Sequence, residues 1–191
     1  MLTKTEWLFM QVAIERLRAG GRCAIVVPNS ILFDGGVGAM VKQRLLKDCD
    51  LHTVVRLPNG VFSPYTLIPT NLLFFEKSGP TRFTWFYELP APEGRRNYTK
   101  TKPLRDEDLA GVEEWWGGPE REGRTEDPHA WRVPITDLIE NGFNLDLRSP
   151  HDDDEFGHRA PRELVADLIE SEREILSLLE AIRARLENGK P

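Results

Sequence analysis

The sequence predicts an α/β fold, built around an open sheet in the first half of the chain. Three short runs rich in apolar residues lie at 23–27, 52–57 and 71–76. The first is apolar at every position, which is typical of a strand buried between two helix layers. A helical segment at 37–48 separates the first two runs, and a loop at 58–70 separates the last two. The predicted order is therefore strand, helix, strand, long loop, strand.

A helix is expected before this sheet, over residues 5–18. Its apolar side chains recur at helical spacing, and Thr3 or Thr5 is suitably placed to cap its N-terminus. We expect Trp7 and Phe9 to be core residues rather than parts of a ligand site, because large aromatic side chains are usually buried.

The composition changes after residue 80, and three further regions are expected there. A strand at 82–87 and a helix at 104–116 indicate a mixed α+β extension. An acidic linker and a long amphipathic helix follow it. The predicted core, extension, linker and C-terminal helix span residues 1–80, 81–150, 151–160 and 161–191.

The composition limits what the chain does. Its 25 Lys and Arg residues against 31 Asp and Glu leave a net charge of −6, so we do not expect the whole surface to bind a phosphate backbone. Cys23 and Cys49 are expected to be a small buried side chain and a free thiol, which fits a reduced, cytoplasmic setting. The apolar runs are too short to span a bilayer, so no membrane association is expected.

Polar residues follow the first predicted strand. Asn29 and Ser30 stand at the carboxyl end of what we expect to be a parallel strand, where open α/β sheets place their ligands. The alternative is that either residue only caps the turn that follows.

Charged and titratable side chains elsewhere have structural explanations. His52 is expected to be structural rather than catalytic. The segment 151–155 with His158 offers ligands for a metal, but a solvated acidic linker is the favoured interpretation. A solvated helix face, with phosphate contacts as the functional alternative, is expected for Lys42, Arg44 and Lys47.

Several motifs, in order and at matching spacing, resemble one family. They are Arg-Ala-Gly-Gly-Arg-Cys-Ala-Ile-Val-Val-Pro-Asn at 18–29, Leu-Phe-Asp-Gly-Gly at 32–36, Leu-Pro-Asn-Gly-Val-Phe at 57–62 and Pro-Thr-Asn-Leu-Leu-Phe-Phe-Glu-Lys at 69–77. Together they resemble the methylation subunit of type I restriction–modification systems, an S-adenosylmethionine-dependent DNA adenine-N6 methyltransferase. The similarity continues through residues 131–151 and so covers most of the chain.

The resemblance implies that residues 1–80 form the C-terminal half of a Rossmann-like S-adenosylmethionine-dependent methyltransferase sheet. Two motifs of the family are absent: the glycine-containing cofactor loop and the Asn/Asp-Pro-Pro-aromatic motif that holds the target amino group. We therefore expect a C-terminal portion of such a subunit, completed by an upstream methyltransferase segment. No catalytic residue is expected in this chain, and by itself it is expected neither to bind S-adenosylmethionine nor to methylate DNA.

The loop between the second and third predicted strands carries the main candidate site. It is longer than the roughly two to five residues that close a hairpin. By the resemblance, Phe62 is expected to stack on an adenine drawn out of the duplex. The alternative is that Phe62 fills the core beneath the loop. The same target-base pocket is expected to be lined by Asn59, Ser63, Tyr65 and Thr66.

The last predicted helix has a heptad seam that requires a partner helix. The resemblance implies that this partner is the helical spacer of a DNA-specificity subunit. Folding back onto the chain's own domain and pairing with a second copy are the alternatives. Glu172 is the one polar residue that interrupts the seam. The apolar seam residues, which are the predicted partner-binding residues, are Val165, Leu168, Ile175, Leu179, Ile182 and Leu186.

Two functions follow from these observations. The first is part of a DNA adenine-N6 methyltransferase, supplying the target-base side of the active site and the docking helix for the specificity subunit. The second is a non-catalytic interaction module or truncated subunit of the restriction complex. The resemblance also implies that another subunit reads the DNA sequence.

Overall fold

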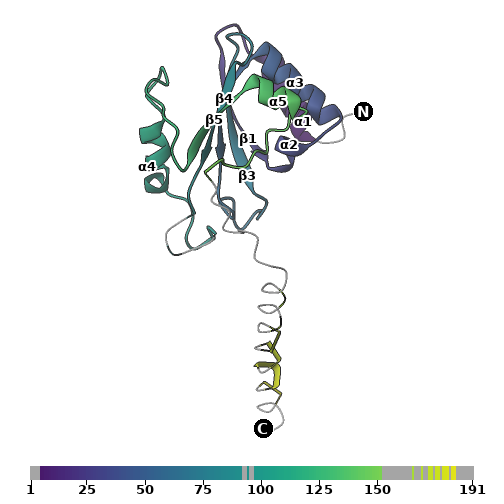
Figure 1. The fold of residues 1–191 in the computed structure, drawn as a ribbon, viewed down its shortest axis with the longest axis vertical. Helices are drawn as coiled ribbons and strands as arrows, with labels where there is room; N and C mark the ends of the chain where they lie inside the picture. The colour runs from purple at the N-terminus through teal and green to yellow at the C-terminus, as the bar shows by residue number, and fades with distance from the viewer. Residues whose placement is uncertain are drawn as a thin grey trace. The chain divides into compact units, whose positions relative to one another are not determined.

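The computed structural model describes residues 5–91, 94 and 97–151, together with positions 165, 169, 172, 173, 175, 176, 178–180, 182 and 183. The chain divides into two compact units, residues 1–151 and residues 152–191. The larger unit is a mixed α/β structure around one five-stranded sheet (Figure 1).

The helices and strands of the larger unit follow the predicted order through the third strand. In chain order they are α1 (Thr5–Arg16), β1 (Arg22–Pro28), α2 (Ser30–Phe33), α3 (Val37–Asp48), β2 (Asp50–Arg56), β3 (Thr70–Glu76), β4 (Phe83–Glu88), α4 (Asp106–Trp115), β5 (Ala130–Pro134) and α5 (Ile135–Glu140).

The sheet is mixed, with the strand order β1-β3-β2-β4-β5. β3 runs antiparallel to both β1 and β2, and β4 is parallel to β2. We predicted that β1 is a parallel strand, but its pairing among the described strands is antiparallel, to β3. Because β1, β2 and β4 share one direction, their carboxyl ends still meet at one edge, beside the start of β3.

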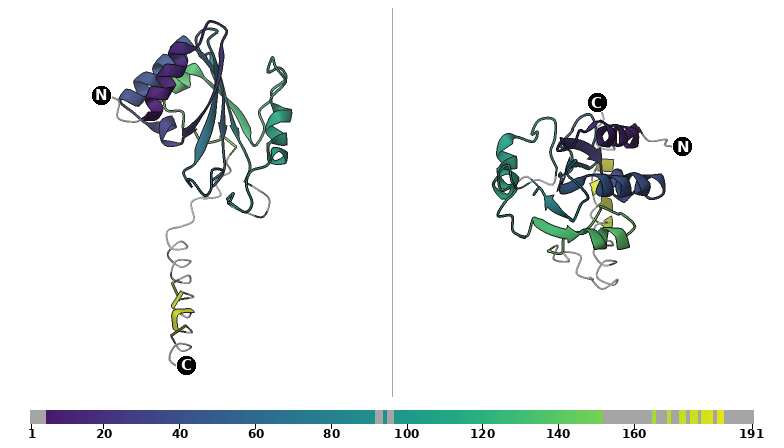
Figure 2. Two further views of the ribbon diagram at one scale, coloured as in Figure 1. Left: turned by 180° about the vertical axis from the view of Figure 1, so that it is seen from behind. Right: turned by 90° about the horizontal axis from the view of Figure 1, so that it is seen from above.

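The two faces of the sheet are covered unequally. Helices α1, α2, α3 and α5 lie on one face, and α4 lies on the other (Figures 1 and 2). The larger apolar core belongs to the first face, and a smaller cluster lies beneath α4 on the second.

The prediction that residues 23–27 are buried on both faces is wrong for the second face. Cys23, Ile25 and Val27 point toward the large core. Ala24 and Val26 point the other way and are exposed, Val26 by 49%. The reason is that α4 packs over β2, β3 and β4, so no described helix covers β1 on that side.

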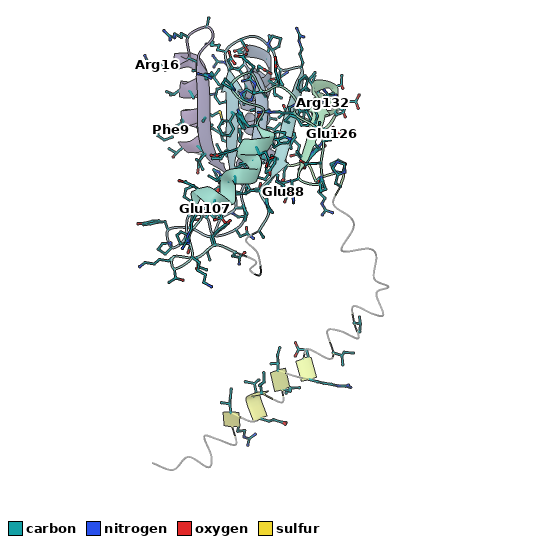
Figure 3. The ribbon with its side chains drawn as sticks, turned by 90° about the vertical axis from the view of Figure 1, so that its left-hand side faces the viewer. Phe9, Arg16, Glu88, Glu107, Glu126 and Arg132 are labelled. Carbon is teal, nitrogen blue, oxygen red and sulfur yellow. The ribbon has the colours of Figure 1, made fainter. Side chains whose placement is uncertain are left out.

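Helix α1 buries a narrower stripe than predicted. Trp7, Met10 and Ile14 are buried on one face, as a helical period of 3.6 requires. Trp7 is therefore a core residue as predicted. The prediction for Phe9 is wrong. Phe9 lies two positions after Trp7 and therefore on another face of the helix, and its side chain is 64% exposed (Figure 3). Thr3 lies outside the described residues.

Helix α3 has the predicted bounds, but one of its cations is not solvated. Lys42 is only 2% exposed, and its Nζ donates to the carbonyl of Leu32 at 2.6 Å. Burial lowers the pKa of Lys42 to about 8, partly offset by the nearby carboxylate of Asp34. Lys42 thus holds the end of α2, whereas Arg44 and Lys47 are exposed as predicted.

The four-residue helix α2 was not predicted from the sequence. Two later elements, β5 and α5, were also not predicted. With β4 they extend the same sheet and its large core rather than forming a separate layer. Cys23 and Cys49 are free thiols, the first partly buried and the second buried. No helix in the described part of the chain is both long and apolar enough to cross a membrane.

Candidate target-base site

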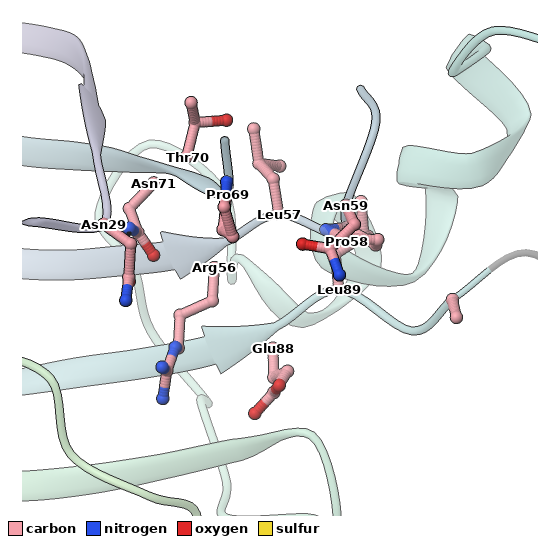
Figure 4. Close-up of a pocket in the computed structure, with 11 residues that line it drawn as sticks. Asn29, Arg56, Leu57, Pro58, Asn59, Pro69, Thr70, Asn71, Glu88 and Leu89 are labelled. Carbon is pink, nitrogen blue, oxygen red and sulfur yellow. Dashed lines mark hydrogen bonds between the residues drawn. The ribbon is translucent and has the colours of Figure 1, made fainter. Parts of the chain in front are cut away.

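A cavity of about 350 Å³ opens at the edge where β1, β2 and β4 end (Figure 4). The pairing register brings this edge together: Asn71 of β3 lies opposite Arg56 of β2, and Arg56 lies opposite Glu88 of β4. The lining residues are Asn29, Arg56, Leu57, Pro58, Asn59, Pro69, Thr70, Asn71, Glu88, Leu89 and Ala91.

A chain of hydrogen bonds crosses one side of the cavity. The Nδ2 of Asn71 donates to Oδ1 of Asn29 at 3.0 Å, and Nδ2 of Asn29 donates to Oδ2 of Asp146 at 3.4 Å. The other oxygen of Asp146 accepts from Nη2 of Arg56 at 2.5 Å. Residues far apart in sequence are thereby joined into one polar network.

The lining combines three carboxamides with the charged side chains of Arg56 and Glu88. Three carboxamides offer donors and acceptors together, as the edge of a nucleobase does. The cationic Arg56 is already paired with Asp146. Within the described residues, no group of three or more His, Cys, Asp or Glu side chains is arranged to hold a metal ion.

The structure brings together only two of the predicted site residues at the cavity. Asn29 and Asn59 line it. Ser30 is the first residue of α2, beside Asn29. The remaining candidates lie on the 57–69 loop, outside the cavity lining: Phe62, Ser63, Tyr65 and Thr66.

The aromatic residues of this loop are accessible. Phe62 is 38% exposed and Tyr65 is 93% exposed. Val61, the residue before Phe62, packs against the small apolar cluster on the second face. Both aromatic side chains therefore have surface available to a ligand near the sheet edge.

Five polar residues of the site were missed by the sequence analysis: Arg56, Thr70, Asn71, Glu88 and Asp146. Arg56 and Glu88 end their strands, and Asn71 lies at the start of β3, so strand-end position is the signal that identifies them. Asp146 has no such signal. It reaches the site because the segment after α5 crosses the sheet edge, where the Leu145 amide donates to the Leu32 carbonyl at 2.9 Å.

The candidate loop is anchored at Gly60. The amide of Tyr98 donates to the carbonyl of Asn59 at 2.9 Å, which holds the two segments in contact. Gly60 has a φ of +80°, and a Cβ added there would lie 2.1 Å from the carbonyl oxygen of Tyr98. Only glycine fits this close approach without moving the backbone.

Gly60→Ala is expected to lower the free energy of unfolding by about 2 kcal/mol, from left-handed strain plus the clash with Tyr98. Gly142→Ala is the matched control, because Gly142 also has a positive φ, +63°, but nothing within 4 Å of an added Cβ. The control is expected to cost about 1 kcal/mol. Urea unfolding of both variants measures the difference, and equal losses would show that the Tyr98 contact does not constrain the loop.

The smaller unit is described at selected positions only. Those positions are helical. Apolar residues among them are between 46% and 64% exposed. Of the predicted seam, Leu168 and Leu186 lie outside the described residues, as do residues 152–155 and His158 of the acidic segment. The described, exposed apolar residues are Val165, Ile169, Ile175, Leu176, Leu178, Leu179 and Ile182.

The family model for N-6 DNA methylase matches residues 2–158. The chain belongs to this family. It is 44% identical over 182 residues to the type I restriction enzyme EcoEI methylase subunit of Escherichia coli, an alignment that covers 94% of this chain and 37% of that protein. The resemblance found in the sequence is therefore confirmed.

Solved structures agree with this assignment. A chain from a structure of the type I R-M system, solved for its assembly and conformational transition, has a TM-score of 0.75 and 40% identity, covering 100% of this chain and 41% of that one. A modification subunit of a putative type I restriction enzyme from Vibrio vulnificus has a TM-score of 0.73 and 41% identity, covering 78% and 33%. The chain thus spans well under half the length of these relatives. Its mixed α/β fold class is confirmed.

Proposed function

We propose that this chain supplies the target-base side of the active site of an adenine-N6 DNA methyltransferase, the modification subunit of a type I restriction–modification complex. The observation that carries the proposal is the cavity lined by three carboxamides at the sheet edge, next to the loop that holds Phe62. An enzyme that acts on a base must take the base out of the duplex stack, and it reads the base by hydrogen bonds and aromatic stacking. The cavity offers the first, and the exposed ring of Phe62 offers the second.

The remaining parts of the reaction are assigned to an upstream methyltransferase segment. S-adenosylmethionine, when bound, supplies a sulfonium methyl group for transfer to the amino nitrogen. No glycine lines the cavity described above, so we assign it to the base rather than to the cofactor. Asn29 and Asn59 bind and orient the base, while the acceptors for the amino hydrogens come from the segment that carries the Asn/Asp-Pro-Pro-aromatic motif.

We also propose that the C-terminal segment docks on the helical spacer of the DNA-specificity subunit. Its described helical positions carry seven apolar side chains that are at least 46% exposed. Such a row of apolar residues on a helix is stabilised by a partner helix. DNA sequence recognition then belongs to that subunit, which fits the net charge of −6 of this chain.

The proposal is tested by transfer of a radiolabelled methyl group from S-adenosylmethionine to DNA. This chain alone is compared with the complete methylation subunit bound to its specificity subunit. We expect the complete complex to methylate DNA and this chain alone not to do so. Methylation by the chain alone would contradict the assignment of the chemistry, and assembly without any methylation would favour a non-catalytic interaction module.

Within the complete complex, Phe62→Ala is expected to lower kcat/KM for methylation by roughly 10- to 100-fold, the range for losing one aromatic stacking partner of a base. Phe83→Ala is the matched control. Phe83 is 39% exposed, against 38% for Phe62, but begins β4 at the opposite edge of the sheet. Gel filtration confirms assembly of each variant. Full activity of Phe62→Ala would remove this residue from the site.

A further inference from the structure

The carboxamide of Asn29 is held in one orientation. A carboxylate accepts hydrogen bonds but does not donate them, so the nitrogen of Asn29 must face Asp146. Its oxygen then faces Nδ2 of Asn71, at 3.0 Å, and accepts from it. Asn71 is 1% exposed and lies within β3, so it is a rigid donor for this contact.

Asp146 is itself fixed, although it lies outside any helix or strand. Two nitrogens of Arg56 clamp its segment: Nη2 donates to Oδ1 of Asp146 at 2.5 Å, and Nη1 donates to the carbonyl of Leu147 at 2.6 Å. The amide of Asp146 also donates to Oδ1 of Asn144 at 2.8 Å. Leu145 is fully buried, which anchors the segment in the large core. Asp146 does not line the cavity, so it acts there through Asn29.

Asn29, which lines the cavity, keeps unused hydrogen-bonding capacity. A carboxamide has two N–H donors and an oxygen with two lone pairs. The network uses one donor and one lone pair. A second N–H remains for a ligand, and a fixed amide donor complements the unprotonated ring nitrogens of adenine, which are acceptors.

We propose that Asn29 donates a hydrogen bond to a ring nitrogen of the target adenine, and that Asp146 is the positioning residue that fixes the direction of this donor. The inference rests on the proposed function, since it requires the cavity at the sheet edge to hold the target base. It assigns a role to the ion pair between Arg56 and Asp146 that no motif of the sequence indicates.

The test deletes the acceptor atom from the base and the donor from the protein. The complete methylation complex is assayed on DNA whose target adenine is replaced by 1-deazaadenine, 3-deazaadenine or 7-deazaadenine. One of the three analogues is expected to lower the kcat/KM of the wild type more than that of Asn29→Ala. The expected difference is roughly 3- to 10-fold, which corresponds to the loss of one hydrogen bond. Asn29→Ala on natural DNA is expected to show a similar loss.

The positioning role of Asp146 has its own readout. Asp146→Ala is expected to remove the same selectivity between adenine and the sensitive analogue, although Asp146 does not touch the base. Asp146→Glu, which keeps a carboxylate, is expected to restore part of that selectivity. Glu140→Ala, at an exposed carboxylate of α5, is expected to leave the selectivity unchanged.

The outcomes separate the inference from the proposed function. If each of the three analogues lowers kcat/KM by the same factor in the wild type and in Asn29→Ala, the inference is overturned. The proposed function is still supported in that case, provided that the wild type methylates adenine and Phe62→Ala lowers this activity. Retention of wild-type selectivity in Asp146→Ala would overturn the positioning role alone. If the wild-type complex does not methylate unmodified adenine, the proposed function fails first. The fluorescence of 2-aminopurine at the target position reports base extrusion in every variant without requiring methyl transfer.

Discussion

Replacing Arg124 by alanine is expected to lower the free energy of unfolding by about 3 kcal/mol, because the side chain joins α4 and its following loop to the sheet. The guanidinium carbon lies 4.5 Å from the ring centroids of both Trp115 and Trp116. Nε donates to the carbonyl of Trp116 at 2.8 Å, and Nη1 donates to Oγ1 of Thr53 at 2.8 Å. Alanine removes all four contacts and leaves space between two indoles.

Part of this loss in stability is offset, because the charged form of the half-buried guanidinium is disfavoured. Burial, followed by the positive charge of Arg121, lowers the pKa of Arg124 to about 10. Its Nη2 is buried and has no hydrogen-bond partner among the described residues. The group still remains charged at neutral pH, because a pKa of about 10 lies well above 7, so the two hydrogen bonds and two cation–π contacts are present there.

Arg132→Ala is the matched control for this prediction. Arg132 also contacts aromatic rings, with its guanidinium carbon 5.1 Å from Phe83 and 5.7 Å from Trp85, but it is exposed (Figure 3). Its removal is expected to cost under about 1 kcal/mol. Urea unfolding followed by tryptophan fluorescence measures both variants. Similar losses for the two arginines would show that the position of Arg124 between the indoles adds nothing to the free energy of unfolding.

The protein is expected to lose about 3 kcal/mol of stability between pH 6.5 and pH 4 through His52 alone. His52 is 8% exposed, and its Nδ1 lies 2.7 Å from Oγ1 of Thr53. Burial, followed by the charges of Arg121 and Arg124, lowers the pKa of His52 to about 3. Between pH 3 and 6.5 the unfolded chain binds a proton at His52 that the folded chain does not, so stability falls as the pH falls.

The acid loss is measured by urea unfolding at pH 7, 5 and 4. His52→Gln is expected to lose stability less steeply with falling pH, because the titrating ring is absent. His129→Gln, at an exposed histidine, is expected to follow the wild type. Asp50 acts in the opposite direction, since burial raises its pKa and favours protonation in the folded state. Parallel profiles for wild type and His52→Gln would contradict the assignment to His52.

Sequence patterns predicted the local elements well where their periodicity was strong. The three central strands, the helix at 37–48 and the intervening loop all lie close to their predicted positions. The elements α2, β5 and α5 were missed, because they span only 4, 5 and 6 residues and too few positions repeat to give a period. Phe9 and Lys42 were misassigned because helical spacing identifies faces, whereas burial depends on what packs against each face.

The candidate site was only partly accessible from sequence. Asn29 was found by its position after a predicted strand, and Asn59 by its place on the long loop that follows the next strand. Arg56, Asn71 and Glu88 carry the same signal but lie inside the strand limits that the structure defines. No sequence rule joins Asp146 to Asn29, since 117 positions separate them.

The sequence by itself determined the family, the α/β class and the order of the central elements, because motifs, apolar periods and turn residues are local properties of the chain. Only the tertiary structure decided that β3 lies between β1 and β2, that no described helix covers the second face of β1, and that Asp146 reaches the sheet edge. These features depend on strand pairing and on ion pairs between distant segments. Such contacts stabilise the protein only when the whole unit is folded, so they cannot be predicted from a short stretch of sequence.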